Sequence, residues 1–354
     1  MWIASVAGAL PEHHYSQDEL ISGFIQIWSE QHHNPDRLVR LHEAVQVGER
    51  NLALPMNEYR NMSFGDANDA FIRVGTDIGE RAIRKALQEA NLEPADVDII
   101  FTTTVTGIAT PSLDARLVNR LGLRSDVKRV PMFGLGCVAG AAGISRMNDY
   151  LAGHPDQVGV LLSVELCSLT LQRGDFSVPN MIASGLFGDG AAAVVGVGRN
   201  RGQEMDCKGP QVVDTRSRFY PDTERVMGWD VEDTGFKIVL AASVPDVVRR
   251  YIRDDVDGFL AEHGMDIAHI NQWICHPGGP KILTAFEDCL ELPDGALEKT
   301  WISLREIGNL SSSSVLFVLR DTLAEMEPKG EESGMLMAMG PGFCSELVLL
   351  KWAK

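Results

Sequence analysis

Between residues 78 and 122, apolar residues first recur at helical spacing, then form a short continuous run typical of a strand, and then recur at helical spacing again. Residues 78–90 carry Ile, Ala and Leu at helical spacing, and residues 99–101 form a short apolar run that continues into three threonines. A further helical pattern begins at Pro111 and closes at Gly122, residue types that favour the start and the end of a helix. This stretch therefore predicts the order helix, strand, helix.

Residues 247–290 repeat that order. A helical pattern over 247–260 closes at Gly264, an apolar strand covers 272–274, and a helix begins at Pro280. Alternation of helical and strand patterns along a chain predicts an α/β fold.

The correspondence continues at Cys137 and Asn309, each directly preceded by Gly. Cys137 lies seven residues after Val130, and Asn309 lies seven residues after Ile302. Each is followed by a helix of small residues and then by an apolar strand, which covers residues 158–164 in the first case and 335–339 in the second. Cys137 and Asn309 would each lie at the tip of a strand, and these two tips are expected to occupy equivalent places in the fold.

We predict an internal duplication, with halves at residues 1–200 and 235–354. The segment 201–234 between them is rich in charge, Gly and Pro, and is expected to form a connecting loop and hairpin. Chance is the alternative, because βαβ units share a common order, but a match over four elements favours duplication. A pseudo-twofold axis between the halves would bring the tip with Cys137 and the tip with Asn309 to one cavity.

Composition and charge exclude several classes of protein. The chain is 45% hydrophobic and 23% charged, which is typical of a globular protein and excludes a disordered, collagenous or coiled-coil chain. A net charge of −17 argues against nucleic acid as the main partner. An anionic substrate would need a local basic patch.

Location is also constrained by the sequence. Gly, Pro or Thr interrupts the longest apolar stretches, so no membrane span is expected, and no basic leader precedes the apolar N-terminus. Six cysteines include no CxxC pair, which fits neither a disulfide framework nor a zinc site. We expect a cytoplasmic protein with reduced thiols and without a bound metal.

Three residues in these motifs carry chemistry that fits one site. Cys137 would begin a helix, where the backbone N–H groups and the helix dipole favour a nucleophilic thiolate. His276 ends a strand before a rigid Pro/Gly turn, and it can pair with a thiolate or donate to a carbonyl oxygen. The Asn309 amide can donate to a developing oxyanion without titrating. The alternatives are a buried filler cysteine, a surface histidine and an asparagine helix cap.

These motifs together resemble the type III polyketide synthases, the chalcone synthase-like branch of the thiolase superfamily. The likeness covers essentially the whole chain and is nearest to the bacterial alkylpyrone-type synthases. Its motifs are Gly136-Cys137-Val138-Ala139-Gly140, Leu186-Phe187-Gly188-Asp189-Gly190, His276-Pro277-Gly278-Gly279-Pro280, Gly308-Asn309-Leu310-Ser311-Ser312 and Gly340-Pro341-Gly342.

The resemblance implies a homodimer with a five-layered αβαβα thiolase fold. It implies that Cys137 accepts a starter acyl group from coenzyme A. His276 and Asn309 would polarise malonyl-CoA for decarboxylative Claisen condensation, and Phe187 would be the gatekeeper between the coenzyme A tunnel and the cavity. Coenzyme A thioesters are then the substrates, and no cofactor or acyl carrier protein is required.

The same resemblance assigns residues that bind the substrate. Arg37 and Arg40 match basic positions that bind coenzyme A in the family, but Ala44 falls where a third cation is expected. Lys281 is the residue that would compensate. A solvated helix face is the alternative for these cations.

Cavity positions of the family match Val105, Leu171, Trp229, Ile238 and Ser311, and they are more aliphatic here than in plant chalcone synthases. An aliphatic tunnel favours an acyl chain by about 0.8 kcal/mol per buried CH₂. We therefore expect a fatty acyl-CoA starter and an alkylpyrone or alkylresorcinol product, with a shorter starter as the alternative because Trp229 narrows the tunnel.

Two other functions stay open. One is a β-ketoacyl carrier-protein synthase III, which uses a similar Cys–His–Asn set but would depend on acyl carrier protein. The other is a non-catalytic thiolase-fold scaffold that only binds acyl-CoA, in which Cys137 would be inert to alkylation.

Overall fold

The computed structural model describes residues 1–28, 34–326 and 331–352. One mixed sheet runs through the molecule. Its first half has the order β1 (Trp2–Ala9), β7 (Asp189–Val197), β6 (Val158–Leu166), β4 (Ile99–Thr104) and β5 (Lys128–Phe133). Its second half has the order β8 (Gln211–Phe219), β13 (Cys344–Trp352), β12 (Glu332–Gly340) and β11 (Gln272–Cys275).

The pairing pattern within the two halves is the same. In the first half β4 is parallel to β6, β6 is antiparallel to β7, and β7 is antiparallel to β1. In the second half β11 is parallel to β12, β12 is antiparallel to β13, and β13 is antiparallel to β8. The halves meet where Trp2 pairs with Gln211. Four strands therefore correspond one to one.

Two parts of the predicted duplication need correction. Asn309 follows a helix, α10 (Glu298–Ile307), and not a strand like β5. The reason is the spacing of Trp301, Leu304 and Ile307, which places these apolar side chains on one helical face. Residues 211–219, predicted as part of a connection, form strand β8, which takes the place of β1 in the second half.

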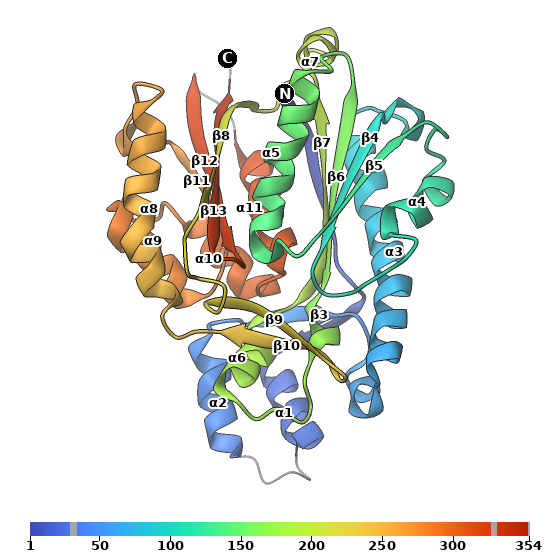
Figure 1. The fold of residues 1–354 in the computed structure, drawn as a ribbon, viewed down its shortest axis with the longest axis vertical. Helices are drawn as coiled ribbons and strands as arrows, with labels where there is room; N and C mark the ends of the chain where they lie inside the picture. The colour runs from blue at the N-terminus through green and yellow to red at the C-terminus, as the bar shows by residue number, and fades with distance from the viewer. Residues whose placement is uncertain (29–33, 327–330, 353–354) are drawn as a thin grey trace.

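Helices complete five layers, which are visible side by side in Figure 1. Two helices fill the centre and contact both half-sheets, namely α5 (Ala139–Ala152) and α11 (Ser314–Glu325). The outer layers consist of α3 (Phe64–Glu89) and α4 (Leu113–Leu121) on one side, and of α8 (Val244–Ala261) and α9 (Pro280–Leu290) on the other. The structure thus has the predicted α/β/α/β/α architecture.

Strands β6 and β7 show why the layers form. Every residue of both strands is buried, as expected for strands covered by helices on both faces. A charged residue in such a strand is unusual, and Glu165 in β6 is one.

The end of the sheet opposite α7 (Arg199–Glu204) is covered by a cap (Figure 1). The cap consists of α1 (Gln17–Trp28), α2 (Pro35–Ala44), α6 (Val178–Leu186), the strands β2 (His13–Ser16) and β3 (Glu49–Leu52), and the hairpin of β9 (Met227–Glu232) and β10 (Gly235–Leu240). Short 3₁₀ helices connect these elements, namely η1 (Met56–Asn61), η2 (Pro94–Asp96), η3 (Gly136–Val138), η4 (Cys167–Thr170), η5 (Ile267–His269) and η6 (Ser311–Ser313). In the part of the chain that the structure describes, no helix combines the length and apolarity needed to cross a membrane.

The two central helices approach closely at Gly140. A Cβ placed on this residue would lie 2.3 Å from the Ser312 carbonyl oxygen and 2.7 Å from a Val315 side-chain carbon. We expect Gly140→Ala to lower the free energy of unfolding by about 1–3 kcal/mol, because the backbone must move to relieve the clash. Gly65→Ala is the matched control, since its Cβ would meet only the Ser63 side chain at 3.7 Å. Denaturant melts of both variants test this, and equal stability would contradict it.

Candidate active site

Cys137 lies in η3, directly before α5, with its side chain buried. The turn depends on Gly136, which has a φ of +56° and whose Cβ would lie 2.6 Å from the Pro341 ring. Only glycine combines a left-handed conformation with so close an approach. This turn places Cys137, the predicted nucleophile, against Pro341 of the second half of the protein.

A chain of hydrogen bonds leads from Cys137 to Asn309. The Cys137 thiol donates to Ser311 Oγ at 3.6 Å, and the Ser311 backbone N–H donates to Asn309 Oδ1 at 2.8 Å. Because Oδ1 accepts this bond, the amide NH₂ of Asn309 is the end that can donate to a substrate. The structure therefore brings the two predicted tips into one site.

Phe187 and Asn309 form an isolated parallel β-bridge. The Asn309 N–H donates to the Leu186 carbonyl at 2.9 Å, and the Gly188 N–H donates to the Asn309 carbonyl at 3.0 Å. Gly308, with a φ of +71°, ends α10 so that the chain can turn into this bridge. The predicted gatekeeper and the predicted amide donor are thus held by the same two backbone hydrogen bonds.

His276 follows β11 and is 5% exposed. Its backbone N–H donates to the Met337 carbonyl at 2.9 Å, which ties it to β12. The turn after it contacts the end of α6, because a Cβ on Gly279 would lie 3.7 Å from Leu186. His276 Nδ1 is buried and has no hydrogen-bond partner among the described residues.

Burial determines the protonation states of this site. It raises the pKa of the Cys137 thiol well above its usual range, although the bond to Ser311 acts in the opposite direction. Burial also lowers the pKa of His276 to about 3. The site therefore holds a neutral thiol and a neutral imidazole. The predicted helix-dipole stabilisation of a resting thiolate is outweighed by desolvation.

Glu165 is a buried carboxyl beside this site that the sequence reasoning missed. It accepts from Thr106 Oγ1 at 2.8 Å and from the Val105 backbone N–H at 3.1 Å, and it also bonds Ser312. Burial raises its pKa, and its charge contributes to the raised pKa of Cys137. A single Glu inside the apolar run of β6 was the signal that could have revealed it.

A narrow cavity lies below Phe187, with about 30 Å³ of free volume. Three residues predicted for the cavity line it, namely Leu171, Trp229 and Ile238. Val105 does not line it but is buried beside Glu165, and Ser311 lies at Cys137 instead. The remaining wall is mixed, since it includes Phe24, Leu52 and Met56 as well as the polar residues Arg50, Tyr59, Ser168 and Thr170.

A larger cleft of about 450 Å³ opens on the other side of Leu186. Gly278 and Gly279, from the turn after His276, line it together with apolar residues of α2, α6 and β10. Lys281 lies at its wall. Arg37 and Arg40 do not line it, but they lie on α2, whose later residues Leu41 and Ala44 do. The cleft is thus a largely apolar hollow next to the turn that follows His276, with Lys281 at its wall.

Within the described residues, no group of three or more His, Cys, Asp or Glu side chains is arranged to hold a metal ion. All six cysteines are free thiols.

Two family profiles match the sequence and cover most of it. The profile described as chalcone and stilbene synthases, C-terminal domain, matches residues 211–353. The profile described as FAE1/type III polyketide synthase-like protein matches residues 45–208. The boundary between them falls next to β8, where the second half of the sheet begins.

Individual proteins are similar over their full length. A 1,3,6,8-tetrahydroxynaphthalene synthase of Streptomyces peucetius subsp. caesius is 52% identical, over 99% of this chain and 93% of the relative. A phloroglucinol synthase of Pseudomonas fluorescens is 30% identical, over 97% of this chain and 96% of the relative. The crystal structure of the tetrahydroxynaphthalene synthase of Streptomyces coelicolor superposes with a TM-score of 0.93 at 30% identity and covers both chains completely.

Proposed function

The chain belongs to the type III polyketide synthases, the family of the chalcone and stilbene synthases, and we propose that it builds an aromatic polyketide from malonyl-CoA alone. As a member of this family it is a malonyl-CoA-dependent acyltransferase. Malonyl-CoA would supply the starter unit as well as the extender units. The observation that carries the proposal is the link from Cys137 through Ser311 to Asn309, together with the position of Leu186. Leu186 accepts a hydrogen bond from the Asn309 N–H, lies against the turn after His276 and lines the larger cleft.

In the proposed reaction, Cys137 Sγ attacks the thioester carbonyl of the starter and expels the thiol of coenzyme A. The neutral imidazole of His276 is the base that can take the Cys137 proton. A second malonyl thioester then loses CO₂, and the electrons of the broken bond form an enolate. Its oxygen accepts hydrogen bonds from His276 and from the Asn309 amide. The enolate carbon attacks the Cys137-bound acyl group, and the thiolate of Cys137 leaves.

The relatives suggest the class of product. The Streptomyces relative is named for tetrahydroxynaphthalene, and the Pseudomonas relative is named for phloroglucinol. Every carbon of either product lies in its aromatic rings, so neither leaves carbon for an alkyl starter chain. We propose a polyhydroxylated aromatic of this kind, with tetrahydroxynaphthalene favoured by the 52% identity.

The names of these relatives do not support the fatty acyl starter that was expected from the sequence. That expectation, with its alkylpyrone or alkylresorcinol product, rested on an aliphatic lining around Trp229. The cavity is narrow, and its largely apolar wall also includes the polar side chains of Arg50 and Ser168. The small volume leaves little room for a long alkyl chain, and the polar side chains offer hydrogen-bond partners to a chain that carries oxygen.

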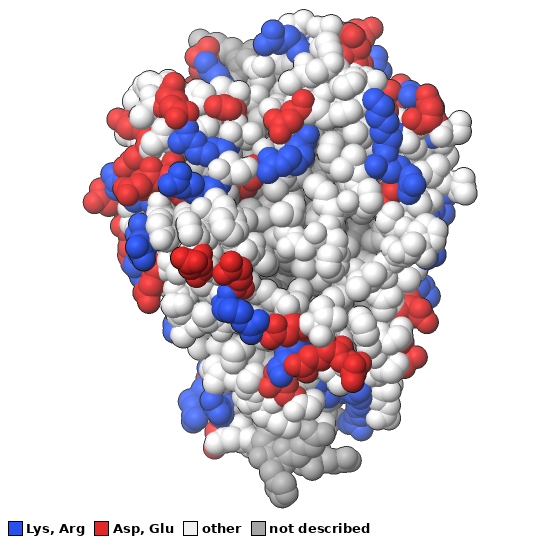
Figure 2. Space-filling model, in the orientation of Figure 1, with Lys and Arg blue, Asp and Glu red and all other residues white. Residues whose placement is uncertain are grey.

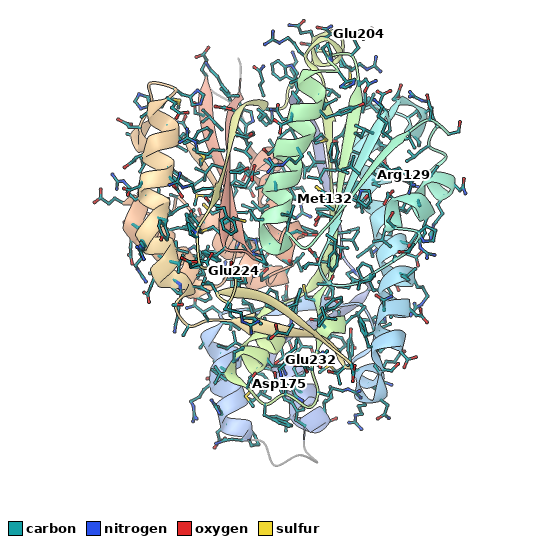
Figure 3. All side chains as sticks on the ribbon, viewed as in Figure 1. Arg129, Met132, Asp175, Glu204, Glu224 and Glu232 are labelled. Carbon is teal, nitrogen blue, oxygen red and sulfur yellow. The ribbon has the colours of Figure 1, made fainter. Side chains whose placement is uncertain are left out.

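A homodimer is part of the proposal. The middle of the face in Figure 2 has few charged side chains, and Figure 3 labels Met132 of β5 in this area. Phe133 and Phe219 are more than half exposed, and β5 is an unpaired edge of the sheet. An apolar face with a free edge strand suits association of two copies. Light scattering should give the mass of two chains. A cytoplasmic location stays a prediction.

Incubation of the purified enzyme with malonyl-CoA alone tests the proposal. We expect an aromatic polyketide without an alkyl side chain in the mass spectrum, formed without acyl carrier protein. Acetyl-, hexanoyl-, long-chain and aromatic CoA esters are then added one at a time. If the enzyme forms a product only when a fatty acyl ester is added, the proposal of a malonyl starter is wrong. Dependence on acyl carrier protein would identify a carrier-protein synthase instead.

The cations near the cleft give a separate prediction. We expect the double variant Arg37→Ala/Arg40→Ala to raise the KM for malonyl-CoA about three- to tenfold with little change in kcat, because exposed cations add modest attraction for phosphates. Arg199→Ala is the control, an exposed arginine on α7 at the other end of the molecule (Figure 1). Unchanged KM in the double variant would remove Arg37 and Arg40 from the coenzyme A site.

A further inference from the structure

Arg50, in β3, is a fully buried cation in the wall of the cavity below Phe187. Its aliphatic stem lies under the loops that hold the active site. A Cβ on Gly188 would lie 3.3 Å from Arg50 Cβ, and a Cβ on Gly308 would lie 3.6 Å from Arg50 Cδ. The guanidinium group is therefore near the bridge between Phe187 and Asn309, on the cavity side.

Two nitrogens of this guanidinium have no partner. Nη2 donates to the Ser184 carbonyl at 2.5 Å, but Nε and Nη1 are buried and make no hydrogen bond to any described residue. Buried donors of this kind are rare in proteins unless a ligand or water satisfies them. A donor left unsatisfied costs about 1–3 kcal/mol, and more when the group is charged.

The charge of Arg50 also lacks a contact ion pair among the described residues. Asp189 is the acid whose charge raises the pKa of Arg50, yet no contact within ion-pair distance joins the two. The Asp189 carboxylate is already used by the Ala53 N–H at 2.6 Å, the Ser168 N–H at 2.8 Å and the Ser168 hydroxyl. Burial lowers the pKa of Arg50 to about 10, so the group stays cationic at neutral pH.

We infer that Arg50 binds the carboxylate of a malonyl starter unit and so selects this starter over uncharged acyl groups. The inference rests on the proposed malonyl-only function. A chain that is attached at Cys137 and grows into the cavity carries the starter at its far end. A malonyl starter that keeps its carboxylate supplies an anion to the two free donors, and the small volume beside them suits a carboxylate better than an alkyl chain.

Arg50→Met tests this assignment because it keeps the volume of the stem and removes the charge. The enzyme is given malonyl-CoA and hexanoyl-CoA at equal concentration, and the two families of products are separated by mass spectrometry. We expect the ratio of hexanoyl-started to malonyl-started products to rise about ten- to hundredfold, the range of one charge-assisted hydrogen bond. Arg50→Lys should shift the ratio less.

A merely structural role would give a different result. It would lower the yield of every product and the rate of malonyl-CoA decarboxylation together. The ratio of hexanoyl-started to malonyl-started products would then stay unchanged, and that outcome would overturn the inference. Arg305→Met is the control for loss of an exposed arginine on neighbouring α10. Its product ratio should equal that of the wild type.

The wild-type enzyme provides a test that does not depend on folding of a variant. Succinyl-CoA and butyryl-CoA differ in the terminal carboxylate, and acylation of Cys137 by each is followed by intact-protein mass. We expect the succinyl ester to react at least about tenfold faster. Equal rates would overturn the role of Arg50 even if malonyl-CoA alone yields product. Absence of product from malonyl-CoA, with a succinyl preference present, would overturn the proposed function instead.

Discussion

Cys137→Ala is expected to abolish polyketide formation while the enzyme still decarboxylates malonyl-CoA. The thiol is the only group in the proposed reaction that carries the growing acyl chain, and loss of a covalent nucleophile costs about 10⁶ in turnover in a well-studied protease. Decarboxylation needs only the two donors, His276 and Asn309. Acetyl-CoA should therefore appear without any condensation product.

The experiment measures both products by mass spectrometry in the same incubation. Cys289→Ala, which removes a free thiol in α9, is the matched control and should behave as the wild type. Thermal unfolding of each variant verifies the fold. Continued chain elongation by Cys137→Ala would disprove its role as acyl carrier.

Asn309→Ala should slow the decarboxylation of malonyl-CoA by about 10²–10³-fold, the usual effect of one lost oxyanion donor. Asn309→Asp should slow it at least as much, although the side chain keeps its size. An aspartate oxygen can still accept from the Ser311 N–H, as Asn309 Oδ1 does at 2.8 Å, but its second oxygen would face the enolate as an anion. Comparison of the two variants therefore distinguishes the effect of the size of the side chain from the effect of its charge on decarboxylation.

Initial rates of CO₂ release provide the measurement for this pair. Asn119→Ala, on the exposed side of α4, is the control. Decarboxylation by Asn309→Ala within about threefold of the wild type would show that Asn309 only shapes the turn at the start of η6, since a lost donor costs far more.

The order of elements was predictable where apolar residues recur at one clear period. The patterns at residues 78–122 and 247–290 correspond to α3, β4 and α4 and to α8, β11 and α9. The prediction was wrong where strand residues are polar. β8 contains Asp214, Arg216 and Arg218, because much of the strand is exposed, and its sequence therefore resembles a loop.

The turns that carry Cys137 and Asn309 were predictable, because Gly136 and Gly308 mark them. The burial of Arg50 was not, since nothing in its sequence context distinguishes it from an exposed arginine, whereas the apolar run around Glu165 was a signal that the prediction did not use. The protonation state of Cys137 was not predictable for the same reason. A helix start suggests a thiolate, but only the surrounding packing shows that water is excluded from the sulfur.

The bridge between Phe187 and Asn309 has a consequence for how such an enzyme can diverge. Exchange of Phe187, which lines the cavity, is an obvious route to a new starter. Yet Phe187 lies between Leu186 and Gly188, the two residues whose backbone hydrogen bonds hold Asn309. Substrate range and turnover are therefore expected to change together in a library randomised at Phe187. A second substitution along the Leu186–Gly188 or Gly308–Ser311 segment would be needed to restore speed, so the order in which mutations arise would restrict the evolutionary routes open to this scaffold.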